Sequence, residues 1–268
     1  MATVRDLAAD SMEGRQAATP GGERARRYLV GRLQALGVAP FEGRYTWRFP
    51  LATDSGTNLL GVIPGTRGGA PYIVLSAHYD HVGIRNGVIH NGADDNASGV
   101  AAVLAIAASL RRNPPRHPVI LALFDAEEGG LRGARAFLAA GPVPRDRIAL
   151  NINLDMVGHS EDGVLWAAGA SHTPALRPVL DSLVRVASVT LKLGHDRPGV
   201  PGEPDWSGSS DHAAFRSAGI PFLYFGVEDH QDYHKPSDDP ETLTPKFFAG
   251  AVAVVEAALR ALDKVIGR

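Results

Sequence analysis

Three mostly apolar runs have the length and composition of strands that are buried on both faces. They span residues 72–77, 118–124 and 148–154. Runs of this kind are typical of strands in the middle of an α/β sheet. Residues 97–110 and 132–140, which lie between them, have the composition and spacing of helices. Strands that alternate with helices predict a mostly parallel sheet with helices packed on its faces.

The rest of the chain extends this pattern in both directions. Thr19 and Pro20 are typical of a helix N-terminus, and Gly37 ends the helical face that follows. No internal repeat or low-complexity segment divides the chain, so one domain over residues 1–268 is the simpler interpretation. The remaining predicted elements are strands at 44–51, 58–63, 163–170 and 220–227, helices at 173–187, 213–218 and 245–265, and a surface loop at 200–209.

The composition narrows the chemistry that this chain can support. A formal net charge of −2, without a block of lysine and arginine, argues against a nucleic-acid surface. The chain has no cysteine, so disulfides and thiolate ligands are excluded and a metal site must use His, Asp and Glu. Such ligands favour borderline or hard divalent ions. No apolar run approaches the roughly 20 residues that cross a bilayer, so we expect no membrane partner.

Residues of metal-ligand type follow each of the three buried strands. His78 follows the first, Glu127 and Glu128 follow the second, and Asp155 follows the third. Parallel strands bring their carboxyl ends to one edge of the sheet, where ligand sites of α/β folds usually lie. Asp94 and Asp95 lie in a turn that leads into the helix at 97–110, so a carboxylate is expected at the same edge, and Asp95 is the member of the pair that the family pattern discussed below favours. The repetition therefore predicts a shared site.

A neighbouring acid supports a metal-binding role for His78. Asp80 lies two residues after it. If one ring nitrogen of His78 binds a metal, Asp80 is well placed to accept the N–H of the other nitrogen. Such a partner fixes the tautomer and the orientation of the ring.

Five short blocks of the sequence resemble the signature blocks of the co-catalytic di-zinc aminopeptidases. This family includes bacterial leucyl aminopeptidase, aminopeptidase S and aminopeptidase Y, and is related to glutamate carboxypeptidase II and the transferrin receptor. Residues 7–38 also resemble the N-terminal segment of these enzymes. The blocks are SAHYDH at 76–81, GADDNASG at 92–99, DAEEGGL at 125–131, NLDMVG at 153–158 and YHKPSD at 233–238.

The resemblance implies a fold and a domain organisation. The fold is a three-layer αβα sandwich with a central mixed, mostly parallel sheet, as in the phosphorylase/hydrolase-like zinc exopeptidases. Larger members insert a protease-associated domain before the first ligand block, where this chain has only the short connection at 58–70. A single zinc peptidase catalytic domain over residues 1–268, without that insertion, is therefore expected.

The resemblance also implies a ligand set for two Zn²⁺ ions per chain. His78 and Asp155 bind one zinc, Glu128 and His234 bind the other, and Asp95 bridges both. Each ion then has three protein donors and room for a bridging water, as catalytic zinc requires. The family often has a cis peptide bond after the bridging aspartate, so a strained bond is expected between Asp95 and Asn96.

Two further residues receive catalytic roles from the resemblance. Glu127, beside the ligand Glu128, is the general base that takes a proton from the bridging water and passes it to the leaving amine. Tyr233, beside His234, donates to the developing oxyanion of the tetrahedral intermediate.

The other histidines are expected to be ordinary. His81 and His90 lie in the loop between the first two ligands and could line the pocket, but a hydrogen-bonded loop side chain is the more common outcome and is the one expected here. His212 matches a family block and is interpreted as support rather than as a ligand. His230 is the alternative to His234, and we discount it because the Tyr-His-x-Pro-Ser-Asp pattern belongs to His234.

The predicted activity is that of an exopeptidase that releases N-terminal residues from peptide substrates with a free N-terminus. The carboxylates at the metals suit a substrate ammonium group, whereas the nearest blocks contain few cations: Arg85, Arg132 and Lys235. A carboxypeptidase or amide deacylase on the same di-zinc site, a glutaminyl-cyclase-like enzyme with one zinc and a receptor-like module without catalysis are the alternatives. Family precedent favours a secreted or periplasmic location with the leader removed, and a cytoplasmic location stays open.

Overall fold

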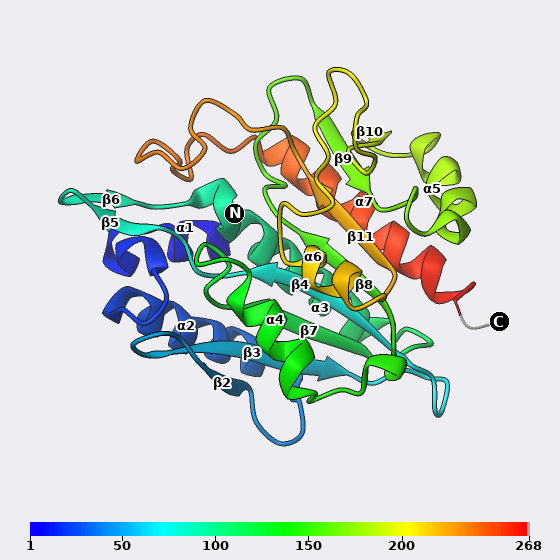
Figure 1. Ribbon diagram of the computed structural model, residues 1–268, viewed down its shortest axis with the longest axis horizontal. Helices are drawn as coiled ribbons and strands as arrows, with labels where there is room; N and C mark the ends of the chain where they lie inside the picture. Colours follow the sequence, from blue (N-terminus) through cyan, green and yellow to red (C-terminus); the bar gives the residue numbers. More distant parts are fainter. Residues whose placement is uncertain (267–268) are drawn as a thin grey trace.

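A mixed β-sheet forms the centre of the computed structural model, which describes residues 1–266. In that part of the chain, nine strands form this sheet in the order β1-β3-β7-β4-β8-β11-β9-β10, with β2 paired to β3 (Figure 1). The strands are β1 (Ala39–Pro40), β2 (Thr46–Pro50), β3 (Ser55–Ile63), β4 (Tyr72–His78), β7 (Val119–Phe124), β8 (Ile148–Leu154), β9 (Val164–Ala168), β10 (Thr190–Leu193) and β11 (Phe222–Gly226).

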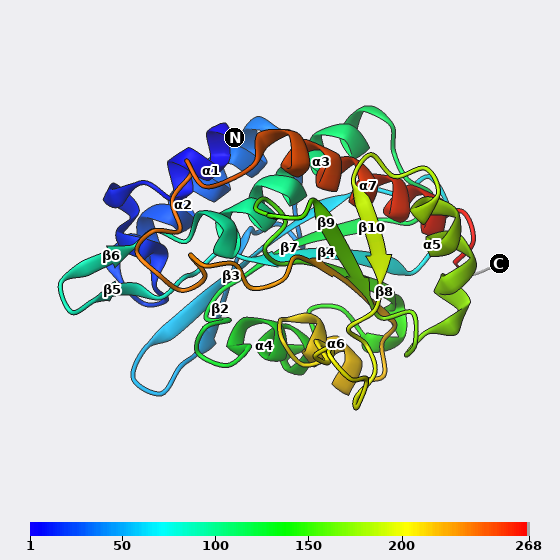
Figure 2. The same ribbon diagram turned by 90° about the horizontal axis from the view of Figure 1, so that it is seen from above.

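Helices cover both faces of the sheet, as Figure 2 shows. One face carries α1 (Ala2–Leu7), α2 (Pro20–Ala35), α3 (Gly99–Arg112), α5 (Arg177–Val184) and α7 (Pro245–Asp263). The opposite face carries α4 (Arg132–Ala140) and α6 (His212–Ser217). The expected three-layer αβα sandwich is therefore confirmed.

The apolar runs are buried on both faces, as their composition predicts. Along β7, Leu121 and Leu123 pack into the core beneath α3 and α7, whereas Ala122 and Phe124 face the core beneath α4 and α6. Alternate residues of a strand point to opposite faces, so a strand covered on both sides is apolar throughout. Phe124 also contacts Phe137 of α4, with ring centroids 5.7 Å apart.

Parallel pairing is concentrated where the predicted site residues lie. Strand β4 runs parallel to both β7 and β8, and β8 runs parallel to β11. The carboxyl ends of these strands therefore lie along one edge of the sheet. Antiparallel pairs join β3 to β7 and β9 to β11, so the sheet is mixed.

Several elements differ from the predicted pattern. The helix expected at 173–187 is a 3₁₀ turn, η4 (Pro174–Leu176), followed by the shorter α5, since Pro178 stands near the start of the second segment. Strand β10 lies within a segment that the apolar pattern left unassigned. Its four residues are too few to show a clear period.

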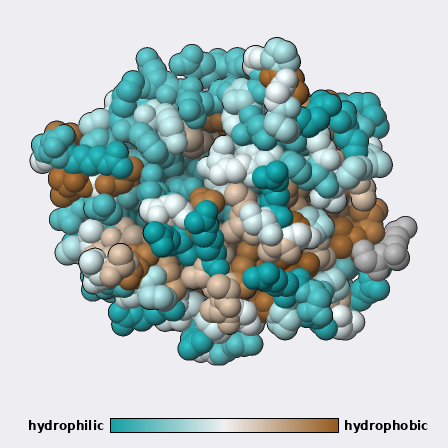
Figure 3. All heavy atoms as spheres, viewed as in Figure 1, coloured by the Kyte–Doolittle hydropathy of each residue, from teal (hydrophilic) through white to brown (hydrophobic). Residues whose placement is uncertain are grey.

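A two-stranded ribbon projects beside the sheet. It consists of β5 (Gly83–Arg85) and β6 (Val88–His90), and it lies at the left of Figure 1. Ile84 and Val88 are about half exposed there, at 49% and 48%. Apolar atoms gather at the same place on the surface in Figure 3. Among residues 1–266, no helix combines the length and the apolar character that a membrane span needs.

Candidate metal centre

Histidine and carboxylate side chains meet in one cleft of about 730 Å³ at the carboxyl edge of the parallel strands. His78 is the last residue of β4, Asp155 directly follows β8, and Glu127 and Glu128 lie in the turn after β7. Asp95 lies in the π-helical turn η2 (Ala93–Ser98), before α3. The cleft is also lined by His234, Tyr233, Tyr224, Trp206, Asp205, Glu228, Asp229 and Arg135, among others.

The first group of donor atoms comes from the end of β4, the residue after β8 and the turn η2. His78 Nε2 lies 3.2 Å from Asp155 Oδ1 and 3.3 Å from Asp95 Oδ1. Donor atoms on a tetrahedral zinc ion lie about 3.3 Å apart when each bond is ~2.0 Å long. The spacing of this group therefore fits a zinc ion.

The second group lies on the other side of Asp95. His234 Nε2 is 3.0 Å from Asp95 Oδ2 and 3.3 Å from Glu128 Oε2. Asp95 thus presents Oδ1 to one group and Oδ2 to the other. Its peptide bond to Asn96 is cis, as the resemblance implied.

The loop that carries His234 also holds the loop that carries Asp95. Asp238 Oδ1 accepts the backbone N–H of Asp94 at 2.9 Å, and Oδ2 accepts that of Asp95 at 3.1 Å. Both ends of this contact are buried. Two segments that are far apart in the sequence are therefore joined at the point where their donor atoms meet.

Asp80 has a different set of contacts from the predicted one. The nearest oxygen to His78 Nδ1 is the backbone carbonyl of Asp80, at 3.1 Å, while its carboxylate oxygen Oδ1 is 3.6 Å away. That carboxylate instead accepts the backbone N–H groups of Glu127, at 3.0 Å, and Glu128, at 3.4 Å. Asp80 therefore orients His78 and also fixes the turn that carries the two glutamates.

Several carboxyl groups are crowded and buried in this region, so their ionisation is costly without nearby cations. Burial raises the pKa of Glu127 to about 10, and the nearby carboxylates of Asp211 and Asp155 contribute to the rise. Burial also raises the pKa of Asp211 to about 8, and neither oxygen of that carboxylate has a hydrogen-bond partner. Burial opposes the ionisation of Glu128, but hydrogen bonds from His234 and His81 lower its pKa to about 2. Together with the donor spacing, this crowding of buried carboxyl groups, which ionise readily only beside cations, fits the binding of divalent cations.

Arg15, which the sequence analysis did not single out, lies beneath the donor groups. Its guanidinium is fully buried and donates to the carbonyl oxygens of Tyr79, at 2.9 Å, and Gly92, at 2.8 Å. It also donates to Leu7 O and Asn91 O. Burial lowers the pKa of Arg15 to about 10 against the opposing charges of Asp95 and other acids. This residue joins the N-terminal segment to the loops that carry the site, and its only signal in the sequence is its place in the N-terminal block.

The expectation for His81 is wrong. Rather than making ordinary loop hydrogen bonds, its Nδ1 lies 2.9 Å from Glu128 Oε1, and the side chain is fully buried. Its position depends on how the loop after β4 packs against the turn after β7.

The remaining histidines lie away from the donor atoms. His230 Nε2 is 3.3 Å from Asp94 Oδ2, and the His230 ring stacks on His159. His212 Nε2 lies 2.8 Å from the carbonyl oxygen of Trp206, and His90 Nδ1 lies 3.2 Å from that of Val88. None of these contacts joins the two donor groups.

Tyr233 lies over His234, with ring centroids 4.0 Å apart. The side chain lines the cleft and is half-buried. Burial and the negative charge of Asp95 raise the pKa of its hydroxyl above the ordinary value. The hydroxyl therefore keeps its proton and can donate a hydrogen bond.

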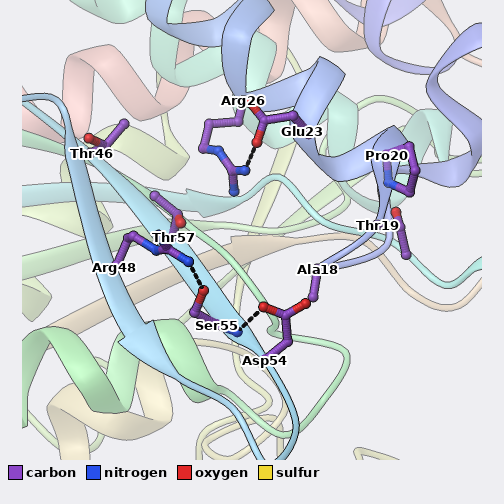
Figure 4. A pocket seen from close by; sticks show the side chains of 10 residues that line it. All are labelled: Ala18, Thr19, Pro20, Glu23, Arg26, Thr46, Arg48, Asp54, Ser55 and Thr57. Carbon is purple, nitrogen blue, oxygen red and sulfur yellow. Dashed lines mark hydrogen bonds and ion pairs between the residues drawn. The ribbon is translucent and has the colours of Figure 1, made fainter.

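A second cavity, of about 410 Å³, lies between the start of α2 and the β2–β3 hairpin. Figure 4 shows Arg26 beside Glu23, and Arg48 donating to Ser55 Oγ at 2.6 Å. Of the residues that the structure describes, those lining this cavity include no predicted ligand. The cleft with the two donor groups is the candidate site.

The fold and the site together define an α/β protein in which histidines and carboxylates form a two-centred donor set. The chain belongs to peptidase family M28, whose model matches residues 58–259. The resemblance found in the five sequence blocks is therefore confirmed at the level of the family.

Curated relatives agree with this assignment. Aminopeptidase YwaD of Bacillus subtilis (strain 168) is 30% identical over 214 residues, which cover 75% of this chain and 44% of the relative. Leupeptin-inactivating enzyme 1 of Streptomyces exfoliatus is 29% identical over 227 residues, which cover 79% of this chain and 47% of the relative. The chain thus spans about half the length of the curated relatives it matches.

Solved structures share the fold. The LapA aminopeptidase of Legionella pneumophila superposes with a TM-score of 0.74 at 20% identity, over 98% of this chain and 70% of that one. A Zn-dependent exopeptidase from Parabacteroides distasonis superposes with a TM-score of 0.71 at 17% identity, over 100% and 98% of the two chains. At these identities the likeness supports the αβα architecture.

Replacement of Arg15 tests its structural role. We expect Arg15→Met to lower the free energy of unfolding by about 3 kcal/mol, because it removes a buried cation from a cluster of buried acids and carbonyls. Arg24→Met is the control, since Arg24 forms a partly exposed ion pair with Glu13 at 2.6 Å and should cost at most about 1 kcal/mol. Urea unfolding of both variants measures the difference, and equal losses would contradict the role of Arg15.

Proposed function

We propose that this chain is a zinc-dependent aminopeptidase that uses two zinc ions to release N-terminal residues from peptides. The observation that carries the proposal is the carboxylate of Asp95, whose two oxygens face two separate donor groups. Membership of peptidase family M28 supports peptide substrates. The proposal treats residues 1–268 as one catalytic domain without a protease-associated insertion.

Each ion has its own protein donors in this proposal. His78 and Asp155 would hold one zinc, Glu128 and His234 would hold the other, and Asp95 would contact both. When bound, zinc polarises a substrate carbonyl and lowers the pKa of water. The donor types and their spacing near 3.3 Å support this allocation.

In this proposal, Glu127 transfers the proton of the attacking water. Its side chain lines the cleft, and the backbone N–H that it donates to Asp80 fixes its place next to Glu128. Nearby cations favour the ionised form of a buried carboxylate, so Glu127 can accept a proton from the attacking water and return it to the leaving amine. The protonated hydroxyl of Tyr233 is available to donate to the oxyanion that develops on the substrate.

The charges that line the cleft favour recognition of a free amino terminus. Asp205, Glu228 and Asp229 add negative charge beyond the donor groups. Arg135 is the one cation among the lining residues that the structure describes, apart from histidine. A substrate ammonium group is stabilised by such carboxylates, whereas a C-terminal carboxylate needs a cationic partner.

Two of the cations considered from the sequence do not line this cleft. Arg85 and Arg132 line a separate cavity, which Glu128 also lines. The third, Lys235, donates its Nζ to the carbonyl oxygen of Gln231 at 2.5 Å. Arg135 is therefore the residue on which the carboxypeptidase alternative depends.

Substitution of the proposed base should separate catalysis from metal binding. We expect Glu127→Gln to keep the fold and both metals but to lower kcat by about 10²- to 10⁴-fold, because only proton transfer is removed. Steady-state kinetics and the zinc content of the purified variant give the two readouts. The exposed Glu241→Gln serves as the control. A Glu127→Gln enzyme with near wild-type kcat would remove Glu127 from this role.

The bridging role of Asp95 predicts a distinctive loss of metal. We expect about two zinc ions per wild-type chain, weaker binding of both in Asp95→Asn, and loss mainly of one in His78→Ala, because only Asp95 faces both donor groups. Elemental analysis and chelator titration measure these values. One zinc per wild-type chain would favour the cyclase-like alternative, and none would favour the receptor-like one. Loss of a single site in Asp95→Asn would count against a bridging carboxylate.

A matched set of peptides tests which terminus of the substrate the enzyme recognises. We expect N-acetylation of a good substrate to lower kcat/KM by about two orders of magnitude, or roughly 3 kcal/mol, since it removes the ammonium charge. C-terminal amidation of the same peptide should have little effect. If amidation abolishes cleavage and acetylation does not, the aminopeptidase proposal fails and the carboxypeptidase alternative replaces it.

A further inference from the structure

His81 is a buried histidine that the proposed reaction does not use. It lies in the loop after β4 and has no exposed surface. Its Nδ1 is 2.9 Å from Glu128 Oε1 and 3.6 Å from Asp95 Oδ2. The two nitrogens of the ring and Glu128 Oε1 have no other hydrogen-bond partner among the described residues, and their mutual contact is a short ion-pair distance rather than an aligned hydrogen bond.

An unsatisfied imidazole in the interior is costly. A buried polar group without a hydrogen bond costs about 1–3 kcal/mol. The contact with Glu128 is at a distance typical of a charge-assisted hydrogen bond. Glu128 is therefore the nearest group that can offset the free-energy cost of burying the His81 ring.

Gly92 leaves space for the ring of His81. A Cβ atom placed on Gly92 would lie 2.5 Å from His81 Cγ and Cδ2, closer than such atoms approach. Gly92 has φ of +58°, in the left-handed region that favours glycine. The ring of His81 therefore packs directly on the backbone of the segment that leads to Asp95.

The two oxygens of Glu128 face two different histidines. Oε1 faces His81 Nδ1, and Oε2 faces His234 Nε2 at 3.3 Å. A carboxylate with one oxygen engaged in this way cannot rotate freely. Its second oxygen stays directed at the donor group that contains His234 and Asp95.

We propose that His81 is a positioning residue for the second zinc ion, acting through Glu128. Its Nδ1–H donates to Glu128 Oε1 and holds Oε2 toward the metal. The inference rests on the proposed di-zinc function. Partners that orient metal ligands typically contribute 10- to 100-fold to metal affinity. His81 contacts Glu128 and Asp95 rather than His78 or Asp155, so the site that His78 and Asp155 would form should be less affected.

Three variants of the full chain test this role. His81→Ala removes the donor. His81→Asn places an amide N–H near the position of Nδ1 and is a poor zinc ligand. His90→Ala is the control, because His90 lies in the same loop region and its ring nitrogen Nδ1 lies 3.2 Å from the backbone carbonyl of Val88 rather than beside Glu128.

The readout is the affinity for each of two zinc ions, measured by competition with a chromophoric chelator. We expect His81→Ala to weaken one of the two sites by about 10- to 100-fold and to leave the other within about twofold. His81→Asn should recover most of the lost affinity, and His90→Ala should match the wild type. Circular dichroism of the apo variants checks that each is folded.

Two results would overturn the proposal. One is a His81→Ala protein with both zinc affinities unchanged, and the other is a His81→Asn protein as weak as His81→Ala, which would show that donation to Glu128 is not the role of the ring. Either result leaves the di-zinc function intact as long as the wild type binds two ions. A wild type that binds no zinc would instead contradict the proposed function itself.

Discussion

Negative charge buried at one edge of the sheet is the constraint on which the rest of this structure depends. A buried carboxylate without a partner costs several kcal/mol, and here burial raises the pKa of Glu127 to about 10 and that of Asp211 to about 8. Such a concentration of acids is sustained only where cations and hydrogen-bond donors surround it. The acids concerned are Asp80, Asp95, Glu127, Glu128, Asp155 and Asp211.

Contacts from distant parts of the chain stabilise these buried acids and the loops that carry them. The guanidinium of Arg15 lies beneath the cluster and joins the N-terminal segment to the loops around Tyr79 and Gly92. Backbone N–H groups donate to the carboxylates of Asp80 and Asp238, and these contacts hold the ligand-bearing turns in place. Divalent cations at the two donor groups would complete the compensation, so metal binding and the stability of this edge are coupled.

Much of the architecture and of the candidate site was predictable, because the relevant signals are local. The runs that became β4, β7 and β8 are apolar because both faces of each strand are covered, and parallel strands necessarily end at one edge. His78, at the end of β4, and Asp155, just after β8, were therefore expected to meet. Strand β10 and the broken helix at 173–187 were not predicted, because short edge elements take their structure from their neighbours.

The sequence by itself thus determined the αβα class, the edge at which the site lies and the residue types that compose it, since apolar periodicity and the alternation of strands with helices are local features of the chain. Only the tertiary structure decided that Arg15 lies beneath the site and that His81 faces Glu128. Those contacts join residues separated by dozens of positions. They follow from how the loops fold over the sheet edge, and neither apolar periodicity nor local spacing records that geometry.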